Sequence, residues 1–311
     1  MRKPLLNLIN STIIFEYNLP NLSKGIDKTI YSIDDDNCFS CRDINSFIEI
    51  IYNSIIEYSF NEFDLNNNDF ENLLTIALKT KIKYNEKLKT SHKIKYGFLG
   101  EVVLYSLLNV IFKSKPLIAR GYFYNPLESS ETKGYDSYHL IEGITQPELW
   151  FGEVKFHTNY KKGINSVFEN INKALSDNYL EQNVYAINNH LNNLNIKNTK
   201  IEQVLNDWNS NPNLKIIDEI KQHNMKLVYP IMILYEENKL GYDESIKRIP
   251  EYVKEKFENL IESFDLSIDY SIFFILFLIK IIFSTLLSYT PYSHQSTKKT
   301  SCNIFKISFG V

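Results

Sequence analysis

Apolar residues recur at helical spacing in three places in the first third of the chain. Ile44–Phe60 and Asn67–Leu78 carry them three and four positions apart, which predicts two amphipathic helices. Lys95–Phe112, KYGFLGEVVLYSLLNVIF, is apolar on more than one face. A helix of that kind is usually central to a core, so we expect Lys95–Phe112 to be buried.

Strand patterns follow this helix. Leu117–Tyr124 alternates enough to predict a strand, and Asn125–Gly134 predicts a loop. Two further strands flank a turn at Gly143–Glu148, where Gly143 and Pro147 favour a reversal of the chain. The pattern therefore predicts a β-hairpin after the central helix.

The second half of the chain predicts helices and one strand. A helix is expected from roughly Asn165 to Tyr179, and KLVYPIMILY at Lys226–Tyr235 predicts a buried strand. Pro230 would suit an edge or a bulge of a sheet better than a central position. Glu244–Phe264 predicts a charged amphipathic helix or helix pair, broken or started at Pro250.

The run Tyr270–Tyr289, YSIFFILFLIKIIFSTLLSY, has Lys280 as its only charge and approaches the roughly 20 residues that span a bilayer. It predicts either a buried strand at Ile272–Ile279 followed by a helix, or a membrane anchor. The anchor is less favoured because a lysine in the middle of such a run costs roughly 2.5–3.5 kcal/mol. No signal peptide is expected at the N-terminus, where polar residues interrupt the apolar stretch.

Composition is that of a globular protein: 44% of the 311 residues are hydrophobic and 23% are charged. The net charge of −3 excludes a global basic surface for nucleic acid, so any such contact must be local. Seven lysines between Lys79 and Lys95, against the single Glu86, form a local basic patch that is more often a solvated face.

Three cysteines argue against a disulfide framework and for a reducing cytoplasm. Cys38 and Cys41 make a lone CxxC without the further ligands that a zinc site needs, so we expect two ordinary thiols in a loop. The expected organisation is a mixed N-terminal region at 1–90, an α/β (α+β) domain at 91–290 and a tail at 291–311.

Candidate chemistry lies on the second strand of the hairpin. Side chains two apart in a strand share a face, so Glu153 and Lys155 project together. Trp150, Val154 and Phe156 project to the opposite, apolar face. The pattern predicts a half-buried strand that displays an acid beside a base.

Asp136 lies on the facing strand. A turn centred near residues 144–146 places it opposite the stretch from Glu153 to Lys155, with Cβ atoms about 5 Å apart across the strands. Two carboxylates that close favour a divalent cation, Mg²⁺ or Mn²⁺, with the Val154 carbonyl as a further ligand. The cation would polarise a phosphate and activate water, and Lys155 would orient or deprotonate that water or neutralise the phosphate.

Glu101 lies within the most apolar helix, where an unpaired carboxylate is costly. A metal ion or its water shell is one candidate partner, and a carboxylate at the start of the helix or a structural salt bridge with a lysine is an equally weighted alternative. His139 and His157 flank the acids without local zinc spacing, which favours structural hydrogen bonds. Lys161 and Lys162 follow the strand as solvent-facing or phosphate-contacting side chains.

Three motifs, GFLGEVVLYSLL at Gly97–Leu108, GYDSYH at Gly134–His139 and LWFGEVKFH at Leu149–His157, resemble the HamA family of the Hachiman bacterial anti-phage system. The resemblance implies a PD-(D/E)XK restriction-endonuclease-like core, whose α-β-β-β-α-β order the predicted elements match. By this analogy Glu153 and Lys155 are the ExK pair, Asp136 the preceding acid and Glu101 the helix glutamate.

The family further implies a DNA nuclease of the bacterial cytoplasm that works beside a superfamily 2 helicase, HamB, and needs no small-molecule cofactor. The helicase would restrain or deliver the nuclease. One alternative is a non-catalytic subunit that binds nucleic acid or the helicase. Another is a membrane-associated defence factor in which Tyr270–Tyr289 matters most.

Overall fold

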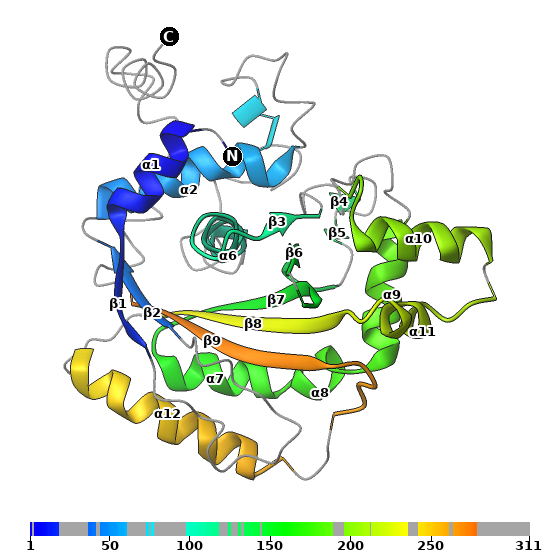
Figure 1. Cartoon of the computed structure of the whole chain (residues 1–311). Helices are drawn as coiled ribbons and strands as arrows, with labels where there is room; N and C mark the ends of the chain where they lie inside the picture. The colour runs from blue at the N-terminus through cyan, green and yellow to red at the C-terminus, as the bar shows by residue number, and fades with distance from the viewer. Residues whose placement is uncertain are drawn as a thin grey trace.

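The fold is a mixed α/β (α+β) architecture, seen in a computed structural model of the chain (Figure 1). The structure describes residues 1, 3–18, 37–41, 44–60, 73–74, 76–77, 98–117, 124–125, 130–131, 134–143, 145–188, 196–211, 213–235, 242–260 and 264–278.

Seven strands form one sheet in the order β1-β2-β9-β8-β7-β6-β3. Strands β2, β9, β8 and β7 run parallel, whereas β1, β6 and β3 pair antiparallel with their neighbours. A two-stranded sheet of β4 and β5 lies apart from it. The strands are β1 (Ile13–Asn18), β2 (Asn37–Cys41), β3 (Lys115–Pro116), β4 (Tyr124–Asn125), β5 (Ser130–Glu131), β6 (Ser137–Glu142), β7 (Pro147–His157), β8 (Lys226–Tyr235) and β9 (Tyr270–Leu278).

Helices lie on both faces of the sheet and at one of its ends (Figure 1). The first face carries α1 (Lys3–Thr12), α2 (Ile44–Ser59) and α6 (Phe98–Val110). The second face carries α7 (Tyr160–Phe168), α8 (Ile171–Ala174) and α12 (Tyr242–Glu258), and the end carries α9 (Asp177–Asn188), α10 (Lys200–Ser210) and α11 (Ile216–Gln222).

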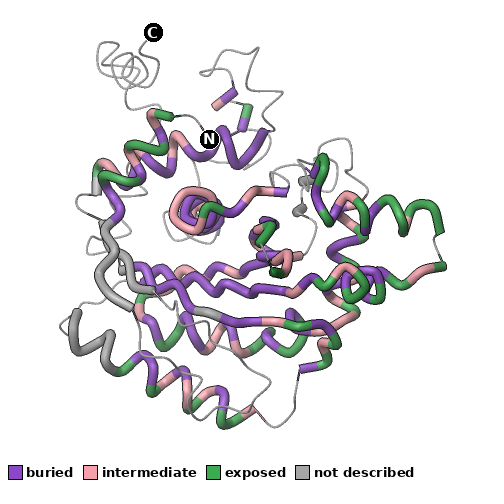
Figure 2. The backbone as a smooth tube through the Cα atoms, viewed as in Figure 1, coloured by how far each residue is buried: buried purple, intermediate pink, exposed green. Residues whose placement is uncertain are grey.

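The core consists of two apolar layers separated by the sheet, and the central strand β8 is buried along most of its length (Figure 2). Alternation along β7 divides its side chains between the layers. Leu149 and Phe151 join the layer under α7, whereas Trp150 and Val154 join the layer under α6. A strand with apolar side chains on both faces has to lie inside a sheet covered by helices, and β7 does.

The predicted helices at Ile44–Phe60 and Lys95–Phe112 are confirmed as α2 and α6. Most of Asn67–Leu78 lies outside the described residues, as do the lysines between Lys79 and Lys95. Residues 118–123 of the expected Leu117–Tyr124 strand also lie outside them. The strand that pairs with β6 is β3, which begins at Lys115, two residues before the expected start at Leu117.

The single helix expected at Asn165–Tyr179 is wrong, because α7, α8 and α9 replace it. Helix α7 begins earlier, at Tyr160, where the Asn159 side chain accepts a hydrogen bond from the Lys162 amide. Ser176 accepts a similar bond from the Tyr179 amide at the start of α9. Side-chain capping therefore marks the starts of α7 and α9, whereas Asn170, which precedes α8, makes no side-chain capping bond.

Two expectations about prolines are also wrong. Helix α12 runs through Pro250 rather than breaking or starting there. Strand β8 is central rather than at an edge, although its ladder to β7 is interrupted between the pairs Trp150–Val228 and Glu153–Ile231. Pro230, which has no N–H to donate, lies in that interruption.

The C-terminal apolar run begins as the expected buried strand, because Ile272 to Phe277 lie within β9 between β2 and β8. Residues 279–311 lie outside the described part. Within the described ranges, no helix combines the length and the apolar character needed to cross a bilayer. Cys38 and Cys41 lie in strand β2 and not in the expected loop.

Candidate active site

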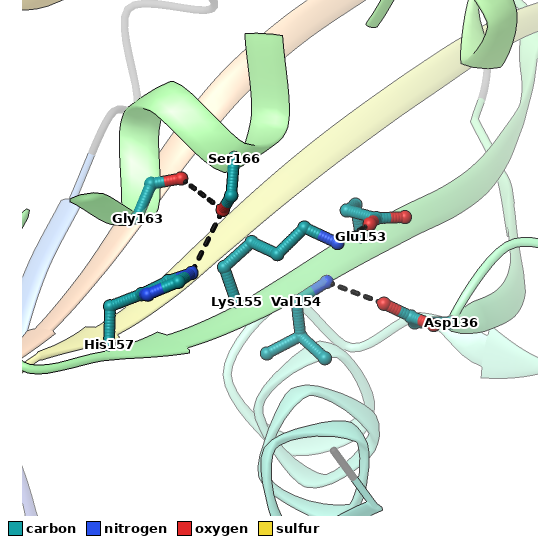
Figure 3. A network of polar contacts seen from close by, with 7 residues as sticks. All are labelled: Asp136, Glu153, Val154, Lys155, His157, Gly163 and Ser166. Atoms are coloured by element: carbon teal, nitrogen blue, oxygen red, sulfur yellow. Dashed lines mark hydrogen bonds and ion pairs between the residues drawn. The ribbon is translucent and has the colours of Figure 1, made fainter. Parts of the chain in front are cut away.

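The candidate site lies where β6 begins and β7 continues past it. Ser137 pairs with Gly152 at the start of β6. The Asp136 amide donates to the Gly152 carbonyl at 2.8 Å, and its Oδ2 accepts from the Val154 amide at 2.8 Å (Figure 3). The structure thus brings Asp136 beside the stretch from Glu153 to Lys155, where the expected register puts it.

Among the residues that the structure describes, none pairs with one edge of β7 beyond Gly152, and we call this the open edge. From Glu153 to His157 the strand pairs with β8, and the described part of β6 does not reach these residues. The N–H and C=O of one strand residue point to the same side, so the Val154 carbonyl lies on the edge where its amide meets Asp136. A carboxylate and a main-chain carbonyl therefore share this edge.

Glu153 and Lys155 lie on the same face of β7 and form an ion pair, with side chains that are 19% and 24% exposed (Figure 3). Burial disfavours the charged lysine, but the Glu153 carboxylate, aided by Asp136 and Glu101, outweighs it and raises the pKa of Lys155. Lys155 is consequently a cation at neutral pH in this arrangement and supplies positive charge rather than accepting a proton.

Gly152 permits the close packing directly before Glu153. A Cβ atom there would lie 2.8 Å from Pro230 Cγ, from the Pro230 carbonyl oxygen and from Ser137 Oγ. Real Cβ atoms do not approach that closely, so any side chain would push β6 or β8 away. The glycine in the GEVKF sequence therefore fixes the spacing of the strands around the acids.

Asn183 on α9 anchors the segment that carries Asp136. Its Oδ1 accepts hydrogen bonds from the Tyr138 hydroxyl at 2.7 Å and from the Tyr135 amide at 3.3 Å. Its Nδ2 donates to the Tyr179 carbonyl at 2.7 Å. Sequence reasoning missed Asn183, because no local pattern links it to a segment more than 40 positions away.

Glu101 reaches the site from the other face of the sheet. Gly100 lets α6 approach β7, since a Cβ there would meet Val154 Cγ2 at 3.0 Å. The buried Glu101 carboxylate accepts a hydrogen bond from the Tyr58 hydroxyl, a partner not expected from the sequence, and is close enough to raise the pKa of Lys155. Its role as a metal ligand stays a prediction.

The histidines have the hydrogen bonds expected of structural residues. His139 is 1% exposed, its Nδ1 lies 2.9 Å from Ser114 Oγ, and burial lowers its pKa to about 3. His157 Nε2 lies 3.0 Å from Ser166 Oγ, whose hydroxyl donates to the Gly163 carbonyl (Figure 3). Burial, with the positive charge of Lys155, lowers the pKa of His157.

Lys161 and Lys162 are exposed in the first turn of α7. Lys161 Nζ lies 5.2 Å from the centre of the Tyr252 ring, which is a cation–π distance. Both side chains project from the helix that follows the candidate site and remain accessible to a ligand.

The donor set at the open edge fits a hard divalent cation such as Mg²⁺ or Mn²⁺. Asp136 and Glu153 supply carboxylate oxygens and Val154 a carbonyl oxygen, the ligand type that these ions prefer. The three predicted metal-binding acids are not gathered tightly: among the described residues, only Asp207, Glu219 and His223 bring three ligand atoms within 4.8 Å. A cation would therefore compete with Lys155 for Glu153.

These features define a class: mixed α/β proteins in which an aspartate and a Glu-x-Lys pair meet at the open edge of a hairpin under a buried helix. Within it, the chain belongs to the HamA family, whose model matches residues 7–282. The family that the three motifs indicated is thereby confirmed, and it makes the chain a component of the Hachiman defence system. No curated protein matches the chain.

Proposed function

We propose that the chain is a metal-dependent nuclease effector that hydrolyses DNA phosphodiester bonds in anti-phage defence. The observation that carries the proposal is the meeting of Asp136 with the Glu153 to Lys155 stretch at an open strand edge. Membership of the HamA family supports the defence context. The bacterial cytoplasm, where phage DNA is found, is the proposed place of action.

Each residue has a task that its position allows. Asp136, Glu153 and the Val154 carbonyl would hold Mg²⁺ or Mn²⁺, with Glu101 as a candidate for its outer shell. When bound, the cation polarises the phosphate and lowers the pKa of water. Asp136 also fixes the Val154 amide, which keeps the open edge of β7 in place.

Lys155 places positive charge beside both acids. Because nearby carboxylates raise its pKa, Lys155 enters the reaction protonated and neutralises charge that develops on the phosphate. In the absence of substrate its partner is Glu153. Loading the site would release Lys155 from Glu153 toward the phosphate.

A partner helicase accounts for how such a site is controlled. Unrestrained DNA cleavage would kill the host, and a chain of net charge −3 lacks a global basic surface for DNA. A superfamily 2 helicase of the HamB type would supply DNA binding and hold the nuclease inactive until infection. The site is then a restrained catalytic centre.

The test is cleavage of plasmid DNA in Mg²⁺ by the chain, alone and with a superfamily 2 helicase of the HamB type. Glu153→Gln and Lys155→Met, alone and combined, should each reduce the rate about 10²-fold or more. Glu255→Gln and Lys221→Met make the same charge changes at exposed positions on α12 and α11 and should cleave normally. Equal DNA loss with the double variant would sink the nuclease proposal.

A non-catalytic subunit is the competing function. It would bind DNA or the helicase equally well with and without the Glu153 and Lys155 substitutions and would cleave under none of the conditions. Binding without cleavage in every activating condition would favour it.

A further inference from the structure

A second cluster of metal-ligating side chains lies far along the chain from the candidate active site. Asp207 comes from the last turn of α10, Glu219 from α11, and His223 follows α11 directly. One ligand atom of each lies within 4.8 Å of the others. The two helices pack against each other at the end of the sheet (Figure 1).

Helical spacing explains why two of the three meet. Glu219 and His223 are four residues apart, and the His223 amide donates to the Glu219 carbonyl at 3.0 Å, so the helical turn continues to the histidine. Their side chains therefore lie on the same side of α11, facing Asp207 on α10.

Glu219 is the unusual member, because it is only 5% exposed and its carboxylate has no hydrogen bond or ion pair with any residue that the structure describes. A carboxylate with so little solvent contact is costly unless a cation or hydrogen bonds offset its burial. One Glu219 oxygen lies within 4.8 Å of a ligand atom of His223 and of one of Asp207.

His223 is the first of these groups. Its Nε2 atom is buried and has no hydrogen bond within the described residues. It lies 3.5 Å from Asp207 Oδ2, an ion-pair contact without hydrogen-bond geometry. The Asp207 side chain is 53% exposed.

We propose that Asp207, Glu219 and His223 bind one Zn²⁺ ion that joins α10 to α11. One imidazole nitrogen and two carboxylate oxygens form a common zinc ligand set, with water in the fourth position. Tetrahedral bonds of about 2.0–2.1 Å separate ligand atoms by about 3.3 Å, so the cluster contracts slightly on binding. The ion satisfies the buried Glu219 carboxylate and Nε2 together.

The consequence is structural. Helix α11 leads through His223 into β8, the strand that pairs with β7 at Glu153. A metal ion at this point fixes the segment from α10 to the start of β8. It takes no part in chemistry at Asp136, so the proposal is independent of the nuclease proposal.

The experiment is zinc titration of the metal-free full-length chain by calorimetry, together with thermal unfolding. The background carries Asp136→Asn and Glu153→Gln, which remove the other acidic pair. One Zn²⁺ per chain should bind, and at about 100 times the Kd it should raise the Tm by about 5 °C. Glu219→Gln and His223→Ala should each abolish both effects.

Two controls make the result decisive. Asp218→Asn removes the same charge from an exposed neighbour on α11 and should bind zinc normally. Glu219→Gln removes a buried charge, so its Tm without metal should equal or exceed that of the background, which separates lost binding from misfolding. The proposal is overturned by absence of zinc binding, or by binding that survives Glu219→Gln and is lost with Cys38→Ser.

Discussion

At the scale of single residues, Lys155 shows how a side chain can be both buried and charged. Burial works against the ammonium group, and the surrounding acids overcome it. The lysine and the acids are thus mutually dependent: removing Lys155 leaves Glu153 without its ion-pair partner, and removing Glu153 leaves a half-buried cation. Single substitutions at this pair affect the structure of the site as well as any chemistry.

His139 gives a prediction about pH. Its pKa is lowered to about 3 by burial, whereas an unfolded histidine has a pKa of about 6.5. Below about pH 6.5 His139 binds a proton in the unfolded chain but stays neutral in the folded chain. The contribution of neutral His139 to the free energy of unfolding is therefore complete above that pH and declines toward pH 3. Between about pH 6.5 and 5 this loss is about 2 kcal/mol.

His139→Asn should therefore flatten the pH dependence of stability while keeping a polar atom near Ser114. Urea unfolding above about pH 7 and at about pH 5 measures this, and the wild type should lose about 2 kcal/mol more than the variant. Identical losses in the two proteins would show that His139 takes up its proton in the folded state.

The hairpin register was predictable from residues, but the partners of several site residues were not. Alternation along Leu149–His157 and the turn at Gly143 fix which side chains share a face, and so place Asp136 against Glu153. The bond between Tyr58 and Glu101, and the contact between Gly152 and Pro230, join segments 43 and 78 positions apart. Local periodicity carries no information about contacts between segments that are so far apart in the sequence.

At the scale of elements, α9 positions the segment that leads through Asp136 into β6. Asn183 is buried and bonds to Tyr135, Tyr138 and Tyr179. Asn183→Ala should destabilise the protein by about 1–3 kcal/mol, because the Tyr138 hydroxyl and the Tyr135 amide lose their acceptor inside the core. Urea unfolding measures the loss.

Gln182→Ala is the matched control, since Gln182 is exposed on the same helix and, within the described part of the chain, its side chain bonds only to Asn178. It should change stability by less than about 0.5 kcal/mol. If the Asn183 substitution were equally harmless, α9 would not anchor the segment.

Boundaries of elements were less predictable than their existence. The apolar spacing from Asn165 to Tyr179 continues across three helices, so periodicity alone suggests one. Asn159 caps the start of α7 and Ser176 the start of α9, and the backbone leaves helical geometry at Asn170, between α7 and α8. The position of Pro230 in a central strand was also not predictable from its own segment. The interrupted ladder that accommodates Pro230 depends on Gly152, which lies in the neighbouring strand β7.

At the scale of the whole molecule, strand β9, near the C-terminal end of the described chain, contacts elements from its N-terminal part. It pairs with β8 on one side and with β2 on the other. Its Phe277 stacks on Phe47 of α2 with ring centres 5.1 Å apart. One apolar layer thus contains residues from α1, α2, α6, β7 and β9.

This apolar layer contains residues from both sides of the domain boundary that was expected near residue 90. The boundary can therefore be tested by dividing the chain there. A chain of residues 91–311 alone would leave the apolar side of α6, with Ile275 and Phe277 of β9, uncovered. Exposing each large side chain costs about 1.5–3 kcal/mol, so we expect this piece to aggregate or to unfold at much lower urea concentration than the full chain.

Co-expression with residues 1–90 as a separate chain should restore a soluble complex, because α1, α2, β1 and β2 supply the missing cover. Size-exclusion chromatography and urea unfolding of the two samples measure this. A monomeric 91–311 piece with the unfolding midpoint of the full chain would instead make the two regions independent domains. Since β9 lies beside β8, and β8 pairs with β7 at Glu153, restored stability and restored geometry at the candidate site should appear together.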